Sequence, residues 1–143
     1  MKAMELTWVA YAIGSAIAFA AMMLVYKKLL LLNVSPVLLN LFVFGFTFAG
    51  FIIMTSVTKT RIDVDTTIIL LLVLASVFAV LGNFLDVKSV QAAPNPGYAG
   101  AIKATQIILI TLAAPLLFKS SLTWPKLAGV VIVLIGMAII SIF

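Results

Sequence analysis

The chain has 143 residues, of which 65% are hydrophobic and only 9% are charged. A soluble domain carries about a quarter charged residues and about half apolar ones, so the composition indicates an integral membrane protein. The formal net charge of +5 does not indicate nucleic-acid binding, because the basic residues are scattered without forming a basic face. Histidine and cysteine are absent from the sequence, which excludes disulfides and the usual zinc and thiol chemistry. We therefore expect neither a metal nor a cofactor.

Five apolar segments are each close to the roughly 20 residues that a helix needs to cross the hydrocarbon core. They predict an all-α membrane protein with five transmembrane helices, at about 6–26, 36–57, 67–92, 97–118 and 125–143. Lys27-Lys28 is expected to close the first span, and TKTRIDVDTT is a strongly polar loop before the third. In PNPG, before the fourth span, Asn95 is expected to be an N-cap and Pro96 the first helical residue.

Small residues recur along three of the spans at helical spacing. Ala10, Gly14 and Ala18 are four apart in the first span, as are Gly97, Ala101 and Thr105 in the fourth, and Gly129 and Gly136 are seven apart in the fifth. Such stripes let helix backbones approach closely, so we expect them to serve helix packing.

Four polar residues lie at matching distances from the PNPG turn. If the turn is the centre of a helical hairpin, Asp86 is level with Lys103, and Asn83 is level with Gln106. At the rise of an α-helix these two levels are about 12 Å and about 17 Å below the turn, so they bracket the midplane of a core about 30 Å thick. Within each helix the two polar residues are three apart and share a face.

Charges inside a membrane have two competing interpretations. A charged residue at a helix centre costs roughly 2.5–3.5 kcal/mol on insertion scales and usually faces a partner or a cavity. The Asp86–Lys103 pair could be an ion pair that only fixes helix register, or part of a substrate or ion pathway, which we favour.

The other polar and aromatic residues of the spans have separate interpretations. Lys88 is nearer the turn and is expected to reach the headgroups. Tyr11 joins the candidate substrate-binding residues, although an interfacial water would also satisfy its hydroxyl. Asn40 in the second span is expected to have a structural role. Five phenylalanines of the same span are expected to pack against other helices or contact lipid: Phe42, Phe44, Phe46, Phe48 and Phe51.

The five spans and the proline turn after the third resemble the EamA domain of the drug/metabolite transporter superfamily over essentially the whole chain. The resemblance rests on the closing sequence PNPGYAGAIKATQIILITLAAPLLFKSSLTWPKLAGVVIVLIGMAIISIF, with Pro94, Pro96, Pro115, Leu122, Gly129 and Gly136. The family commonly has a Gly-Glu pair after the fourth helix, where this chain has Lys119-Ser120, so a role for an acid there is in doubt.

The resemblance implies more about architecture and function. Most relatives look like two five-helix domains fused as an inverted repeat, with the substrate in a central cavity lined by the third and fourth helices. Residues 1–143 would then be one such domain, half of an inverted-repeat transporter in the plasma or inner membrane. The implied function is secondary transport of a small polar or amphiphilic metabolite, amino-acid-like if both charges meet the substrate, by alternating access in a dimer.

Two other functions stay open. Small multidrug-resistance exporters have four spans and a membrane-embedded glutamate in the first, whereas Glu5 precedes the apolar run here. A membrane scaffold or accessory subunit without flux of its own is the second alternative. An enzyme is not expected, because the sequence offers no nucleophile–base or metal constellation.

The loop charges give a weak orientation signal. The N-terminal side carries five basic residues, Lys2, Lys59, Arg61, Lys119 and Lys126. The opposite side carries three, Lys27, Lys28 and Lys88. Since orientation follows basic residues in short loops, this small difference favours a cytoplasmic N-terminus without enforcing it. We expect dual topology and an antiparallel homodimer.

Overall fold

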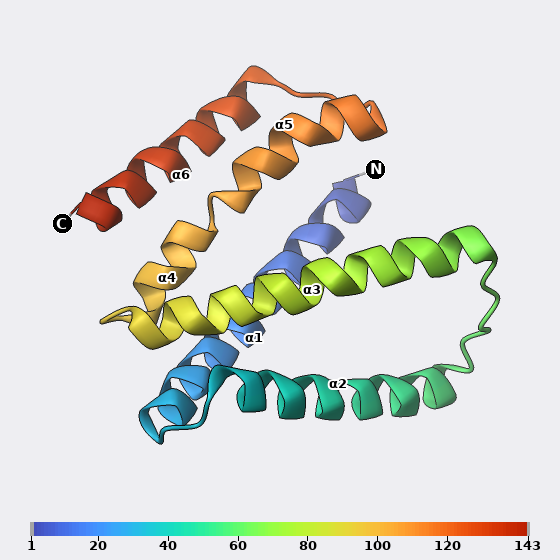
Figure 1. The fold of residues 1–143 in the computed structure, drawn as a ribbon. Coiled ribbons are helices and arrows are strands. Elements are labelled where there is room, and N and C mark those ends of the chain that lie inside the picture. The colour runs from blue at the N-terminus through green and yellow to red at the C-terminus, as the bar shows by residue number, and fades with distance from the viewer. Residues whose placement is uncertain (1, 143) are drawn as a thin grey trace. The chain divides into compact units, whose positions relative to one another are not determined.

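The computed structural model describes the backbone of residues 2–142 and the side chains from Thr7 onward. The side chains of Lys2 and Glu5, which entered the topology count and the comparison with multidrug exporters, lie outside the described residues. Within the described range the chain forms six helices (Figure 1): α1 (Lys2–Leu31), α2 (Pro36–Thr58), α3 (Thr66–Ala92), α4 (Pro96–Lys103), α5 (Gln106–Phe118) and α6 (Trp124–Ile142).

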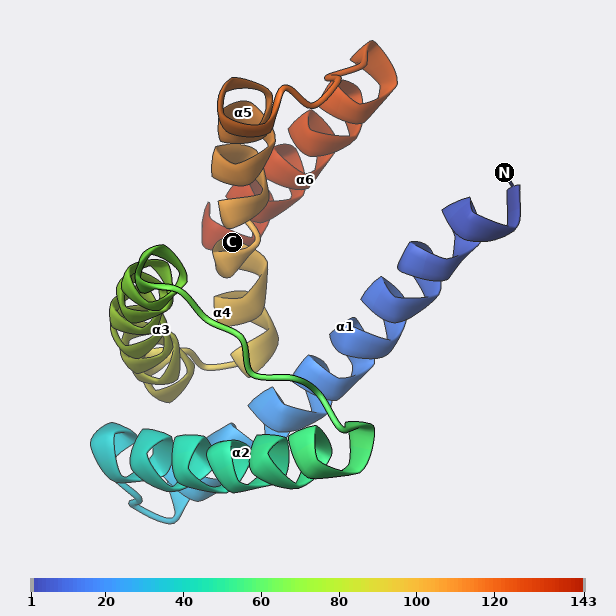
Figure 2. The ribbon, with the colours of Figure 1, turned by 90° about the vertical axis from the view of Figure 1, so that its right-hand side faces the viewer.

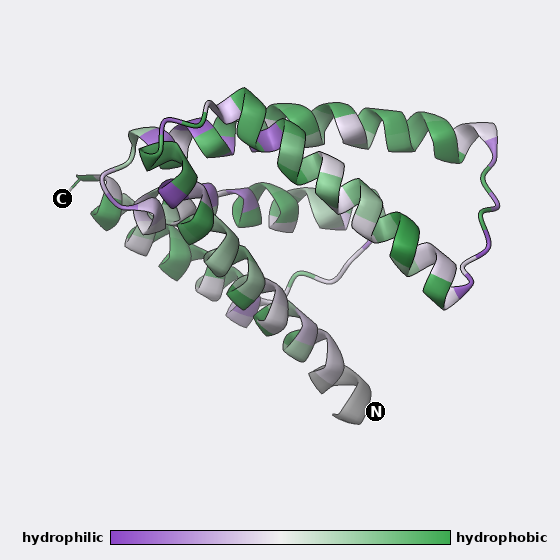
Figure 3. Cartoon of the chain, turned by 90° about the horizontal axis from the view of Figure 1, so that it is seen from below, coloured by the Kyte–Doolittle hydropathy of each residue, from purple (hydrophilic) through white to green (hydrophobic). Residues whose placement is uncertain are grey.

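Among the described residues, five stretches are long and apolar enough to cross a membrane, with α4 and α5 together forming the fourth. The five predicted spans are therefore confirmed. Figure 3 shows hydrophobic colour along the helices and hydrophilic residues in the connection between α2 and α3, the polar loop that the sequence predicted.

One predicted boundary is wrong. α1 does not end before Lys27-Lys28 but continues to Leu31, where Asn33 adopts a left-handed backbone (φ 63°). Both lysines are good helix formers and are followed by four leucines, so nothing before Asn33 stops the helix. The fourth span has the predicted extent, Pro96–Phe118, but Ala104 and Thr105 separate α4 from α5 within it.

The N-terminal unit, residues 1–91, comprises α1, α2 and nearly all of α3. Its buried residues come from the end of α1, the start of α2 and the last two turns of α3: Tyr26, Leu30, Leu39, Asp86, Val87 and Val90. Most large apolar side chains elsewhere on these helices are exposed. The three helices therefore converge at one end of the unit, and their remaining length presents apolar surface suited to lipid or to another protein.

The C-terminal unit, residues 92–143, holds α4, α5 and α6. α5 continues the path of α4, and α6 runs back so that its end lies beside α4 (Figures 1 and 2). The start of α4 follows the sequence prediction: the Asn95 side chain accepts a hydrogen bond from Gly97 N–H at 2.8 Å, and Pro96 is the first helical residue.

The small-residue stripes do not produce the expected close helix packing within the described chain. A Cβ placed on Gly14, Gly129 or Gly136 would meet no heavy atom within 4 Å. The faces that carry these glycines are therefore open in this chain.

Candidate functional site

Asp86 is a buried carboxylic acid, 8% exposed, on the penultimate turn of α3. The fully buried Val87 follows it, and Tyr26 of α1, which is itself only 4% exposed, interacts with it electrostatically. Ser89 Oγ donates a 2.8 Å hydrogen bond to the Asp86 backbone carbonyl. The sequence predicted an intramembrane acid here, but it did not predict the neighbouring tyrosine.

Asn83 lies one turn earlier on α3 and is half-buried. Its Nδ2 donates to the Ala79 carbonyl at 2.8 Å, within the same helix. This bond uses the amide nitrogen of Asn83 and not its amide oxygen, Oδ1. The amide oxygen is thus the part of Asn83 suited to meeting a ligand donor.

Lys103 and Gln106 stand on either side of the interruption in the fourth span. Lys103 is the last residue of α4 and Gln106 the first of α5, and both side chains are exposed. They belong to the C-terminal unit, whereas Asp86 and Asn83 belong to the N-terminal unit. The pairing of the two sets across the hairpin remains a prediction.

The interruption has a definite hydrogen-bond pattern. Ala104 N–H bonds both the Gly100 and Ala101 carbonyls at 3.1 Å, and Thr105 N–H bonds the Ile102 carbonyl at 3.1 Å. Thr105 Oγ1 donates to the same Ile102 carbonyl at 2.8 Å. The chain thus tightens for about one turn to hydrogen bonds between residues three apart, while Ala104 and Thr105 keep right-handed helical backbone angles. The Thr105 hydroxyl bonds a carbonyl of this turn.

Two further polar residues of the N-terminal unit differ in their surroundings. Tyr11 on α1 is 76% exposed and is not part of the buried cluster around Asp86. Asn40 on α2 donates from Nδ2 to the Pro36 carbonyl at 3.0 Å, and its buried Oδ1 has no hydrogen-bond partner among the described residues. A buried acceptor of this kind is satisfied by water or by a donor from another molecule.

The pattern of spans and the matched residues decide the family. The profile of the EamA-like transporter family matches residues 6–142. The chain belongs to the EamA-like transporter family. It is therefore a multi-pass integral membrane protein and a transporter of the drug/metabolite transporter superfamily, and not an enzyme. Searches among curated proteins and among solved structures each gave no match.

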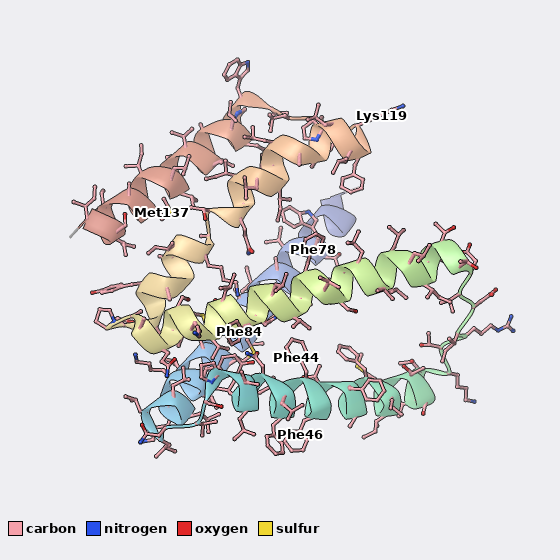
Figure 4. All side chains as sticks on the ribbon, in the orientation of Figure 1. Phe44, Phe46, Phe78, Phe84, Lys119 and Met137 are labelled. Carbon is pink, nitrogen blue, oxygen red and sulfur yellow. The ribbon has the colours of Figure 1, made fainter. Side chains whose placement is uncertain are left out.

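Other features of this EamA-like chain lie away from the polar residues. An open hollow of about 520 Å³ runs along the first half of α3 and is almost entirely apolar, lined by Ile69, Leu72, Val73, Ser76, Val77, Val80 and Leu81. On α2, Phe44 and Phe46 project from opposite sides of the helix (Figure 4), and the Phe42 and Phe46 ring centroids are 6.0 Å apart. Such rings do not gather into a cage for a cation. Lys88 Nζ lies 5.2 Å from the centre of the Phe84 ring on its own helix.

Sequence reasoning did not identify Tyr26, Lys27 or the interruption at Ala104-Thr105 as parts of this region. Lys27 Nζ donates to the Val90 carbonyl at 3.1 Å and to the Gln91 carbonyl at 3.4 Å, so it contacts α3 instead of only reaching for headgroups. The only sequence signal for the interruption was Thr105, whose hydroxyl can bond a carbonyl three residues back.

Proposed function

We propose that this EamA-like protein is a secondary transporter whose substrate-binding residues are Asn83 and Asp86 of α3 and Lys103 and Gln106 of the fourth span. The observation that carries the proposal is the interruption of the fourth span between Lys103 and Gln106. Local departures from regular α-helix beside polar residues of a membrane span are typical of substrate sites in secondary transporters.

The depth of the interruption supports this proposal. Lys103 is seven residues from the start of α4, which corresponds to about 10 Å at the rise of an α-helix. α5 continues for 13 residues beyond the break, or about 20 Å. The interruption thus falls inside a hydrocarbon core about 30 Å thick, where irregular backbone is tolerated only against protein or a water-filled cavity.

The charges suggest the chemical class of the substrate. Lys103 would meet an anionic group, Asp86 a cationic group or a coupling proton, and the two amides would supply neutral hydrogen bonds. A zwitterion satisfies both charges at once, which favours a small amino-acid-like metabolite. Tyr11 stays in the proposed set as a peripheral contact, since its exposed hydroxyl is available to a ligand or to a second copy of the chain.

Flux into liposomes that contain only this protein tests the function. We expect saturable uptake of zwitterionic amino acids by exchange, and its loss in Asp86→Asn and in Lys103→Gln while both variants still insert. Export of lipophilic cations without amino-acid exchange would indicate the multidrug-exporter alternative. Absence of flux for every solute class, from correctly inserted protein, would indicate a scaffold or accessory subunit.

The assembly that we propose is an antiparallel homodimer in the cell membrane. Five spans put the two ends of this segment on opposite sides, so a second copy in the reverse orientation would complete an inverted pair with closed two-fold symmetry. The exposed apolar faces of the spans and the open glycine faces support a partner of this kind.

A single cysteine at Thr60, in the α2–α3 loop, tests this assembly because the chain has no native cysteine. Labelling of intact cells with an impermeant thiol reagent should give comparable labelled and protected fractions. If every copy is labelled, or every copy is protected, the inverted homodimer is wrong and a parallel dimer or a separate partner must replace it.

A further inference from the structure

The C-terminal end of α3 lacks the usual means of satisfying its last carbonyls. A helix leaves four C=O groups without partners in the helix, and a left-handed residue after the end, most often glycine, commonly provides donors. After α3 the chain runs through Pro94 and Pro96, which have no N–H, and the next glycine is Gly97. Within the described chain, left-handed residues follow three other helix ends, at Asn33, Lys59 and Lys119, but none follows α3.

Lys27 supplies the missing donor from another helix. Its Nζ lies 3.1 Å from the Val90 carbonyl oxygen and 3.4 Å from that of Gln91. Both carbonyls belong to the last turn of α3, the negative end of the helix dipole, where a cation is most favourable. The Val90 side chain is fully buried, which limits competition from water for the first of these bonds.

The same segment of α1 also lies near the preceding turn of α3. Tyr26, the neighbour of Lys27, is buried, as are Asp86 and Val87 of that turn. Lys27 thus bonds the turn of α3 that follows the buried acid, whereas the adjacent Lys28 is exposed.

We propose that Lys27 is the C-terminal cap of α3 and a positioning residue that keeps Asp86 at its place in the substrate site. The role for Asp86 rests on the proposed function, but the cap itself does not. Without the Lys27 ammonium the last turn of α3 loses a charged donor, and local opening at that end exposes Val87 and Asp86.

The experiment uses a Val87→Cys reporter in the cysteine-free chain and a small permeant maleimide. Loss of a hydrogen bond from a charged donor raises the equilibrium constant for local opening by about tenfold to a hundredfold. We therefore expect Lys27→Met to speed labelling of the reporter by about that factor. Lys28→Met is the matched control and should leave the rate within about twofold of the parent. Lys27→Arg keeps a charged donor and should restore slow labelling.

The outcomes separate the cap from the proposed function. Equal labelling rates in the Lys27→Met and Lys28→Met proteins overturn the cap, whatever the protein transports. Fast labelling in Lys27→Met together with normal flux overturns the positioning role and leaves the proposed function standing. If Lys27→Met is not recovered folded, Lys27→Gln, which retains a neutral donor, should label at an intermediate rate, and a parental rate there would also overturn the cap.

Discussion

A double-mutant cycle on Asp86 and Lys103 tests the predicted pairing across the hairpin. Asp86 is 8% exposed and lies six residues before the end of α3, which puts it about 9 Å along the helix from that end. Removing one partner of a buried ion pair costs about 3–5 kcal/mol, because the other charge is left uncompensated. Since the Lys103 side chain is exposed in the described chain, we expect the lower end, about 3 kcal/mol, for Asp86→Asn or Lys103→Gln alone.

The double variant should cost much less than the sum of the single changes. Asparagine and glutamine can hydrogen-bond each other without a buried charge, so we expect a total loss of about 1–2 kcal/mol and a coupling energy of about 4 kcal/mol. The free energy of unfolding in mixed micelles measures all four proteins. Asp86→Asn combined with Lys88→Gln is the control cycle, because Lys88 lies over the Phe84 ring of its own helix. If the losses of unfolding free energy in Asp86→Asn and Lys103→Gln add to that of the double variant within about 0.5 kcal/mol, the pairing is refuted. A folded double variant with normal flux would leave the pair a purely structural role.

Three other results are expected. Thr105→Val removes the hydroxyl bond to the Ile102 carbonyl and should lower stability by about 0.6–1.5 kcal/mol in unfolding measurements, whereas an unchanged protein would mean that the hydroxyl does not support the interruption. Cysteines at Asn83 and Gln106 should cross-link within one chain, and efficient cross-linking only of pairs offset by a turn or more would mean that the hairpin register is wrong. Amide hydrogen exchange should be faster at 104–107 than at 88–91, and equal protection of both segments would argue against a flexible interruption.

The sequence predicted the number of spans and most of their ends because each depends on local composition. Long apolar runs need lipid, and the Asn95-Pro96 start of α4 follows from the donors and the backbone angle that those residues provide. The predicted end of α1 is wrong because the long stems of Lys27 and Lys28 are compatible with a continuing helix.

The surroundings of Asp86 depend on contacts between helices and could not be predicted in the same way. Tyr26 and Lys27 are more than fifty residues from Asp86 in the chain, and hydrophobic patterning indicates which residues are apolar, not which helix each one touches. The need for a cap was nevertheless present in the sequence, since two prolines and no glycine follow directly after α3. Such a helix end needs donors from water or from a side chain elsewhere in the chain, and here Lys27 provides one.

The two helices that carry the polar residues differ in how their critical segments are held. The end of α3 is held by a charged donor from α1, and charge-assisted hydrogen bonds are roughly twice as strong as neutral ones. The backbone at the interruption of the fourth span has neutral hydrogen bonds between residues three apart and one bond from the Thr105 hydroxyl. Segments that move during function come from the less stable parts of a structure. Under the proposed alternating access, we therefore expect the fourth span to bend at Ala104-Thr105 more readily than α3 bends at its C-terminal end.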